Sequence, residues 1–127
     1  MKGLEQYVLI ALGSAVGGCL RYWVGSSVAS RYGTAFPWGT FVINVTGSLV
    51  IGTFLAFTLE RVAIDPRWRF LIAVGFCGSY TTFSSYSFES FLLAEQGHYG
   101  LALANFVANN VFALLAVATG AVLARVI

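Results

Sequence analysis

Residues 75–89 read Gly75-Phe-Cys-Gly-Ser-Tyr-Thr-Thr-Phe-Ser-Ser-Tyr-Ser-Phe-Glu89, a run of glycines, hydroxyls and aromatic rings inside an otherwise apolar chain. No charged residue lies between Arg69 and Glu89, and that interval has about the 17 to 25 residues that a membrane-spanning helix requires. Small and hydroxyl residues at membrane depth favour close helix packing, a helix break or a polar path. The stretch is therefore not a plain lipid-facing helix, and its composition indicates a segment built around an ion.

The composition indicates an integral membrane protein. Of the 127 residues, 58% are hydrophobic and only 9% are charged, whereas a soluble domain carries about 25% charged residues. The net charge of +2 is small and dispersed, so it does not provide the basic stripe of a nucleic-acid-binding protein. Cys19 and Cys77 lie in apolar segments, where thiols behave as small hydrophobes, and indicate no redox compartment.

Runs with few charges divide the chain into four predicted membrane spans within a single domain, residues 1–127. The approximate spans are 4–28, 36–59, 69–93 and 99–125, and each is long enough to cross a bilayer. Turn residues such as Gly33 and Asp65-Pro66 connect them and leave no room for a soluble domain. We predict an all-α membrane protein with four transmembrane helices per subunit.

Small residues form faces on the first two spans. Gly13 and Gly17 make a GxxxG pair, and Gly47 and Gly52 lie on the second span. Such faces let helices approach closely. Because four short helices cannot enclose a wide pore, we expect the faces to contact a second subunit, with packing inside one subunit as the alternative.

Side-chain amides recur at helical spacing in the second and fourth spans. Asn44 lies four residues before Ser48, and Asn105 four before Asn109, while Asn110 is turned away by about 100°. An amide NH2 group offers two donors without a charge that would trap an anion, so these positions suit an anion path. The alternative is that each amide joins helices, for a gain of about 0.6 kcal/mol.

Enzyme chemistry is not indicated. The chain has one His, no HExxH motif, no paired carboxylates within a span and no Gly-rich phosphate loop. Its carboxylates lie at or near span ends, where they are expected to be solvated, which also disfavours a proton-coupled transporter. They are Glu5, Glu60, Asp65, Glu89 and Glu95.

Four motifs occur in an order typical of one known family. They are Gly17-Gly-Cys-Leu-Arg21-Tyr22, Pro37-Trp-Gly39-Thr40-Phe-Val-Ile-Asn44, Gly78-Ser-Tyr-Thr81-Thr82-Phe83-Ser84-Ser-Tyr86-Ser87-Phe-Glu89 and Gly97-His-Tyr99-Gly-Leu-Ala102. On these motifs the chain resembles the Fluc (CrcB-like) family of fluoride channels over essentially its full length. The third motif is highly specific.

The resemblance implies an antiparallel, dual-topology homodimer with two fluoride pathways along the subunit interface. It also implies that the third helix is broken between Gly78 and Thr81. A structural Na+ ion, not transported, would be held at the break by the backbone carbonyls of these two residues. Asn44 would be the pore amide, Phe83 and Tyr86 the two aromatic stations. The remaining pathway residues expected are Arg21 near a vestibule, Thr82, Ser84, Ser87 and Asn109.

Three positions depart from the family pattern. Tyr86 stands where Phe is usual, and its hydroxyl has two open roles: donating to fluoride, or tying the ring to a neighbour. Ser79 replaces a second glycine, which we expect to stiffen the break. Phe112-Ala113 replaces Gly-Ser, and Asn109 and Asn110 are the candidates to substitute for that serine.

The function implied is passive fluoride efflux from the cytoplasm, which lowers fluoride toxicity, by a multi-pass protein of the cell (inner) membrane. One alternative is a small dual-topology proton-coupled multidrug exporter, which needs a carboxylate within the first helix; Glu5 is too near the terminus. Another is the non-conducting half of a heterodimer with a paralogue, because basic residues are biased to the side of the termini, which favours cytoplasmic termini. These are Lys2, Arg61, Arg67, Arg69 and Arg125.

Overall fold

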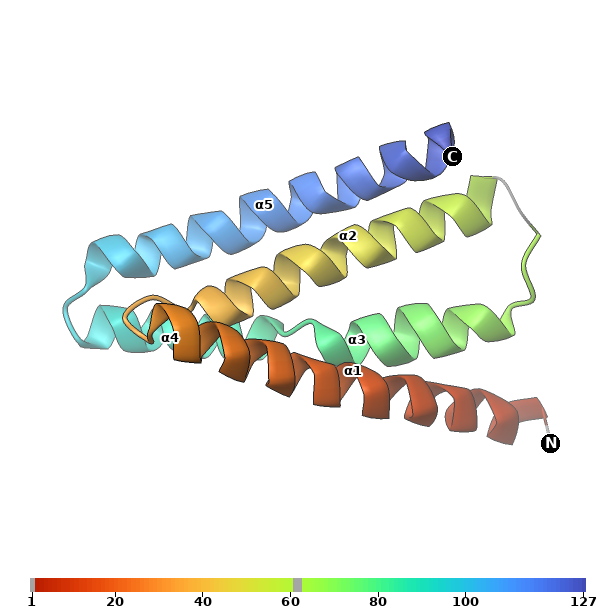
Figure 1. Ribbon diagram of the computed structural model, residues 1–127, viewed down its shortest axis with the longest axis horizontal. Helices are drawn as coiled ribbons and strands as arrows, with labels where there is room; N and C mark the ends of the chain where they lie inside the picture. Colours follow the sequence, from red (N-terminus) through yellow and green to blue (C-terminus); the bar gives the residue numbers. More distant parts are fainter. Residues whose placement is uncertain (1, 61–62) are drawn as a thin grey trace.

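The computed structural model of the chain describes residues 2–60 and 63–127, and within them every regular element is a helix. The helices lie side by side in an elongated bundle, with both termini at the same end (Figure 1). The all-α prediction is confirmed. The elements are α1 (Lys2–Tyr32), α2 (Trp38–Glu60), the π-helix η1 (Arg69–Cys77), α3 (Gly78–Tyr80), α4 (Phe83–Glu95) and α5 (Tyr99–Val126).

Three helices in the described part of the chain are long and apolar enough to cross a membrane. They are Gly3–Tyr32 of α1, Trp38–Glu60 and Tyr99–Val126, matching the predicted spans 4–28, 36–59 and 99–125. The chain is therefore a multi-pass membrane protein. The predicted span 69–93 is not one continuous helix: η1, α3 and α4 follow one another along it (Figure 1).

The break in this segment lies at two threonines. Thr81 has φ −75° and ψ 157°, and Thr82 has φ −149° and ψ 107°, so both are extended. Gly78, by contrast, is helical at φ −61° and ψ −33°. The break was expected between Gly78 and Thr81, and it lies at the C-terminal end of that interval and at Thr82. Ser79, which was expected to stiffen the break, lies before it in the helical turn Gly78–Tyr80. β-Branched threonines tolerate the extended backbone well.

The glycine faces pack within the chain. A Cβ at Gly13 would collide with the backbone of Leu71 and Phe76 in η1, and one at Gly17 would collide with the carbonyl of Phe76. Gly52 is similarly close to the backbone of Val117 in α5. The close helix contact predicted from these residues is present, but it is intramolecular. Contact with a second subunit is therefore not needed to explain these glycines.

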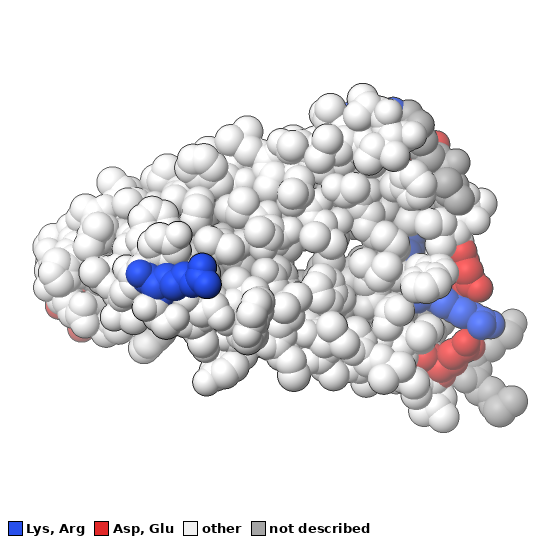
Figure 2. Space-filling model, viewed as in Figure 1, with Lys and Arg blue, Asp and Glu red and all other residues white. Residues whose placement is uncertain are grey.

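Charged side chains gather at the end of the bundle that holds the termini (Figure 2). There Arg67 Nε lies 3.2 Å from Glu5 Oε1, and Arg125 Nη2 lies 2.7 Å from Glu60 Oε1. Arg61, which contributes to the charge bias noted above, lies outside the described residues, as does the side chain of Lys2. The ion pairs form a polar rim, and the apolar body of the bundle adjoins it.

Replacing Gly17 by Ala tests the contact between α1 and η1. The added methyl group would push against the η1 backbone, and such overpacking costs about 1–3 kcal/mol. We expect a lower melting temperature of the detergent-purified protein. Gly100→Ala is the matched control, because Gly100 is also helical and a Cβ added there would meet no atom within 4 Å. Equal stability of the two variants would contradict the contact.

Candidate functional site

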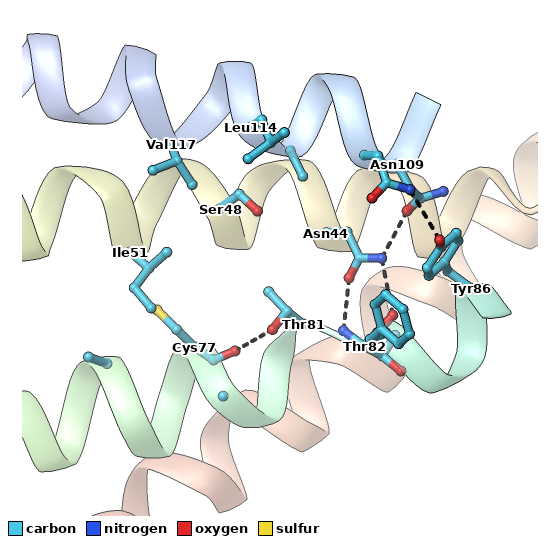
Figure 3. A pocket seen from close by; sticks show the side chains of 15 residues that line it. Asn44, Ser48, Ile51, Cys77, Thr81, Thr82, Tyr86, Asn109, Leu114 and Val117 are labelled. Carbon is cyan, nitrogen blue, oxygen red and sulfur yellow. Dashed lines mark hydrogen bonds between the residues drawn. The ribbon is translucent and has the colours of Figure 1, made fainter. Parts of the chain in front are cut away.

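A groove of about 360 Å³ lies where the break faces α2 and α5 (Figure 3). No charged side chain lines it among the described residues. The groove brings together residues that the sequence predicted from separate motifs. They are Asn44, Thr82, Phe83, Tyr86 and Asn109 of the predicted fluoride path, and Gly78 and Thr81 of the predicted Na+ site.

Asn44 holds the break through two hydrogen bonds to one residue. Its Oδ1 accepts the Thr82 N–H at 2.8 Å, and its Nδ2 donates to the Thr82 carbonyl at 3.1 Å. The same Nδ2 donates to Asn109 Oδ1 at 2.9 Å. The side-chain amide thus replaces backbone partners that a continuous helix would supply. Because both amide hydrogens are already donated, an anion that binds Asn44 must displace one of these acceptors.

The amides continue as a buried chain toward α4. Asn109 Nδ2 donates to the side-chain oxygen of Asn105 at 2.9 Å and to its carbonyl at 3.0 Å. Asn105, which is fully buried, donates to Ser90 Oγ at 2.9 Å. The chain links α2, α5 and α4. The amides therefore do join helices, as the alternative interpretation of the sequence allowed, and Asn44 and Asn109 also line the groove.

Two backbone carbonyls at the break lack their helical donors. In a continuous helix the Thr82 N–H would bond to the Gly78 carbonyl and the Ser85 N–H to the Thr81 carbonyl. Instead Thr82 N–H is donated to Asn44, and Ser85 N–H to Thr82 Oγ1 at 3.2 Å. Oxygen atoms of this kind suit a hard cation. The residues present therefore fit the Na+ ion implied by the resemblance.

Arg21 lies at the break. Its Nη1 is 3.5 Å from the Thr81 carbonyl oxygen. A carbonyl has two lone pairs, so Thr81 can accept from Arg21 and still face a second positive group. The guanidinium adds a positive charge close to the groove without lining it.

The two predicted aromatic stations contact each other. The rings of Phe83 and Tyr86 lie 5.0 Å apart at 76°, an edge-on arrangement that points a positive ring edge toward a negative ring face. Phe83 is 74% exposed, whereas Tyr86 is 5% exposed. The Tyr86 hydroxyl accepts a hydrogen bond from Asn110 Nδ2 at 3.1 Å, so it is tied to a neighbour.

Some predicted residues lie outside the groove lining. Ser84 is exposed, and Ser87 Oγ donates to the Phe83 carbonyl of its own helix at 2.9 Å. At the Phe112-Ala113 departure, Ala113 lines the groove and Phe112 packs edge-on against Phe41 at 5.7 Å. Asn109 and Asn110, the candidates to replace the missing serine, both line the groove.

One polar contact was not predicted from the sequence. Thr40 Oγ1 donates to Glu89 Oε1 at 2.8 Å, while Glu89 Oε2 is buried without a partner among the described residues. The expectation that Glu89 is simply solvated is therefore wrong. The two residues are 49 positions apart, so no local spacing signals their contact. The only hint is that Thr40 shares a helix face with Asn44.

The apolar helices and the uncharged groove of amides, hydroxyls and ring edges define a small multi-pass protein of the membrane-transport class. Residues 8–121 match the family described as CrcB-like protein, Camphor Resistance (CrcB), and the chain belongs to this family. The resemblance predicted from the four motifs is confirmed.

Curated relatives match nearly the whole chain. A protein of Koribacter versatilis is 51% identical over 122 residues, covering 96% of this chain and 97% of the relative. One from Sulfurihydrogenibium is 42% identical over 124 residues, covering 98% and 100%, and one from Rhodospirillum rubrum is 47% identical over 116 residues, covering 90% of each. All three relatives are named fluoride-specific ion channel FluC.

Asn44→Ala tests the clamp on the break. The substitution leaves the buried peptide group of Thr82 without its partner, and a buried unsatisfied group costs about 1–3 kcal/mol. We expect a clear fall in thermal stability. Thr58→Ala on the same helix is the control, because among the described residues the Thr58 hydroxyl bonds only to the Leu55 carbonyl of its own helix. If Asn44→Ala were as stable as Thr58→Ala, the clamp would not hold the break.

Proposed function

We propose that the chain is a passive fluoride channel that lets fluoride leave the cytoplasm and so lowers fluoride toxicity. It acts in the cell (inner) membrane and is a channel rather than an enzyme. The single observation that carries the proposal is the groove, which gathers neutral donors and aromatic edges beside a helix break and has no charged lining in the described part of the chain. The names of the full-length relatives support it.

The chemistry of the groove suits fluoride. Fluoride is small and tightly hydrated, so a selective path must replace its water with close donors. Amide NH2 groups, hydroxyls and the positive edges of aromatic rings can do this without a fixed charge that would trap the ion. Asn44, Tyr86 and Phe83 bring an amide, a hydroxyl and an aromatic ring to the groove. The Asn44 amide donates to the ion only when the ion displaces one of its two present acceptors. Larger anions gain less from these donors and fit less well.

The assembly that we propose is an antiparallel, dual-topology homodimer, with each chain crossing the membrane four times and η1, α3 and α4 together forming the broken third span. Two pathways would run along the subunit interface. The groove supports this arrangement, because Phe83 lines it yet is 74% exposed, leaving one side for a second copy to cover. A heterodimer with a paralogue would cover the same side.

The alternative functions receive less support. A proton-coupled multidrug exporter needs a carboxylate on its path, and none lines the groove among the described residues. A non-conducting half of a heterodimeric channel is less well supported. The chain matches relatives over nearly their full length, and those relatives are themselves named as channels.

We also propose that the Gly78 and Thr81 carbonyls of two chains hold one structural Na+ ion at the centre of the dimer. A two-fold axis near the break would bring two pairs of these carbonyls together. The bound ion would supply a fixed positive charge and link the two broken helices. Asn44 prepares the site by withdrawing the Thr82 N–H from Gly78.

Fluoride efflux from proteoliposomes tests the function. Vesicles containing the purified protein and loaded with fluoride should release it rapidly, whereas vesicles loaded with chloride should release little, because chloride gains less from neutral donors. An anion-selective electrode follows both, and protein-free vesicles give the background. Comparable rates for the two anions would contradict the proposal.

Removing Na+ tests the proposed cation site. An ion that binds only the assembled protein stabilises it by about 2.7 kcal/mol at 100 times its dissociation constant. Replacing Na+ by N-methylglucamine at equal ionic strength should therefore lower the melting temperature and the fluoride efflux rate. Restoring Na+ should recover both. Unchanged stability and unchanged efflux without Na+ would exclude the site.

A further inference from the structure

The Tyr86 hydroxyl is an acceptor in its bond with Asn110. The amide nitrogen of Asn110 can only donate, and it lies 3.1 Å from the Tyr86 oxygen. The same nitrogen donates its second hydrogen to the Phe106 carbonyl at 2.7 Å, which fixes the amide on α5. Tyr86 therefore receives a hydrogen bond from an anchored group, and its own proton takes no part in that bond.

The proton of Tyr86 has no acceptor among the described residues, although the side chain is only 5% exposed. The other two hydroxyl side chains of the broken helix that line the groove are different. Thr81 Oγ1 donates to the Cys77 carbonyl at 2.9 Å, and Thr82 Oγ1 donates to Ser85 Oγ at 2.9 Å. Both of those protons are used inside the protein. Of the three, Tyr86 is the one that can donate to a ligand.

The Tyr86 hydroxyl lies among side chains that line the groove. Tyr86 extends from α4 toward the asparagines of α5, and Tyr86, Asn109 and Asn110 all line the groove (Figure 3). Accepting a hydrogen bond polarises a hydroxyl and strengthens the bond that it donates. A hydroxyl that only accepts still has a proton that can form a second hydrogen bond. The Tyr86 proton is thus available to an acceptor that enters the groove.

We propose that the Tyr86 hydroxyl donates a hydrogen bond directly to fluoride in the groove, with Asn110 as the positioning residue that orients it. This inference rests on the proposed channel function. It assigns the binding to the hydroxyl, a group that a phenylalanine at this position would lack. Asn110 does not bind the anion in this arrangement, since its two amide hydrogens are bonded to Tyr86 and Phe106.

The test is fluoride efflux from proteoliposomes over a range of fluoride concentrations, giving a half-saturating concentration and a maximal rate. Loss of a hydrogen bond to a charged group should raise the half-saturating concentration of Tyr86→Phe about tenfold or more. The maximal rate should be kept, because the ring edge remains. Asn110→Ala should shift the half-saturating concentration in the same direction but less.

The double variant separates positioning from direct binding. If Asn110 acts through the hydroxyl, adding Asn110→Ala to Tyr86→Phe should produce no further shift, because coupled residues are not additive. Tyr80→Phe is the matched control. Tyr80 is also buried, and its hydroxyl lies 2.9 Å from Thr46 Oγ1, but it does not line the groove. Its half-saturating concentration should equal that of the wild type.

Three results would overturn the proposal while the channel function stands. They are an unchanged half-saturating concentration in folded Tyr86→Phe, an equal shift in Tyr80→Phe, and loss of assembly in Tyr86→Phe with no shift in the protein that remains assembled. The last would mean that the hydroxyl bonds to a second copy. Absence of fluoride efflux from the wild type would overturn the channel function as well, and is seen before any variant is compared.

Discussion

The bonds between the Asn44 side chain and the Thr82 peptide group are the constraint on which the site depends. A helix break in a membrane leaves polar backbone groups in a medium that cannot solvate them, at several kcal/mol each. Asn44 satisfies one N–H and one carbonyl of the break, at 2.8 and 3.1 Å. By doing so it withdraws the N–H from Gly78. One side chain thus both permits the break and leaves a carbonyl free.

The same amide has a second effect, because it is not isolated. Asn109 and Asn105 continue the hydrogen bonding from α2 to α4, and all three amides are buried. Buried polar networks are strong when every member is satisfied and costly when one is not. This favours one geometry of the groove. A groove that keeps one shape can discriminate among anions by size, because it does not widen to accept a larger ion.

Local sequence patterns predicted the helices and the asparagines of the groove, because apolar runs and four-residue spacings are properties of a single helix. The other groove residues were predicted from the family resemblance of the third motif. The position of the break was not predictable from glycine content, since it depends on Asn44, 38 residues away from Thr82. The Thr40–Glu89 contact and the Asn110–Tyr86 bond likewise join separate helices. The contact of Gly13 with η1 of the same chain could not be predicted either. A small-residue face has the same sequence pattern whether it packs within one chain or against another.

The π-helical winding of η1 also affects where chain length can change among members of the family. A π-helix bonds each N–H to the carbonyl five residues back, so each of its turns contains more residues than a turn of an α-helix. Residues 69–77 can therefore lose a position by winding as an α-helix while their two ends stay in place. A deletion in α2 cannot be absorbed by a change of helix type, because α2 is already α-helical. It would rotate Asn44 away from Thr82 by about 100°. Over evolution, length changes should be tolerated in η1 and eliminated from α2.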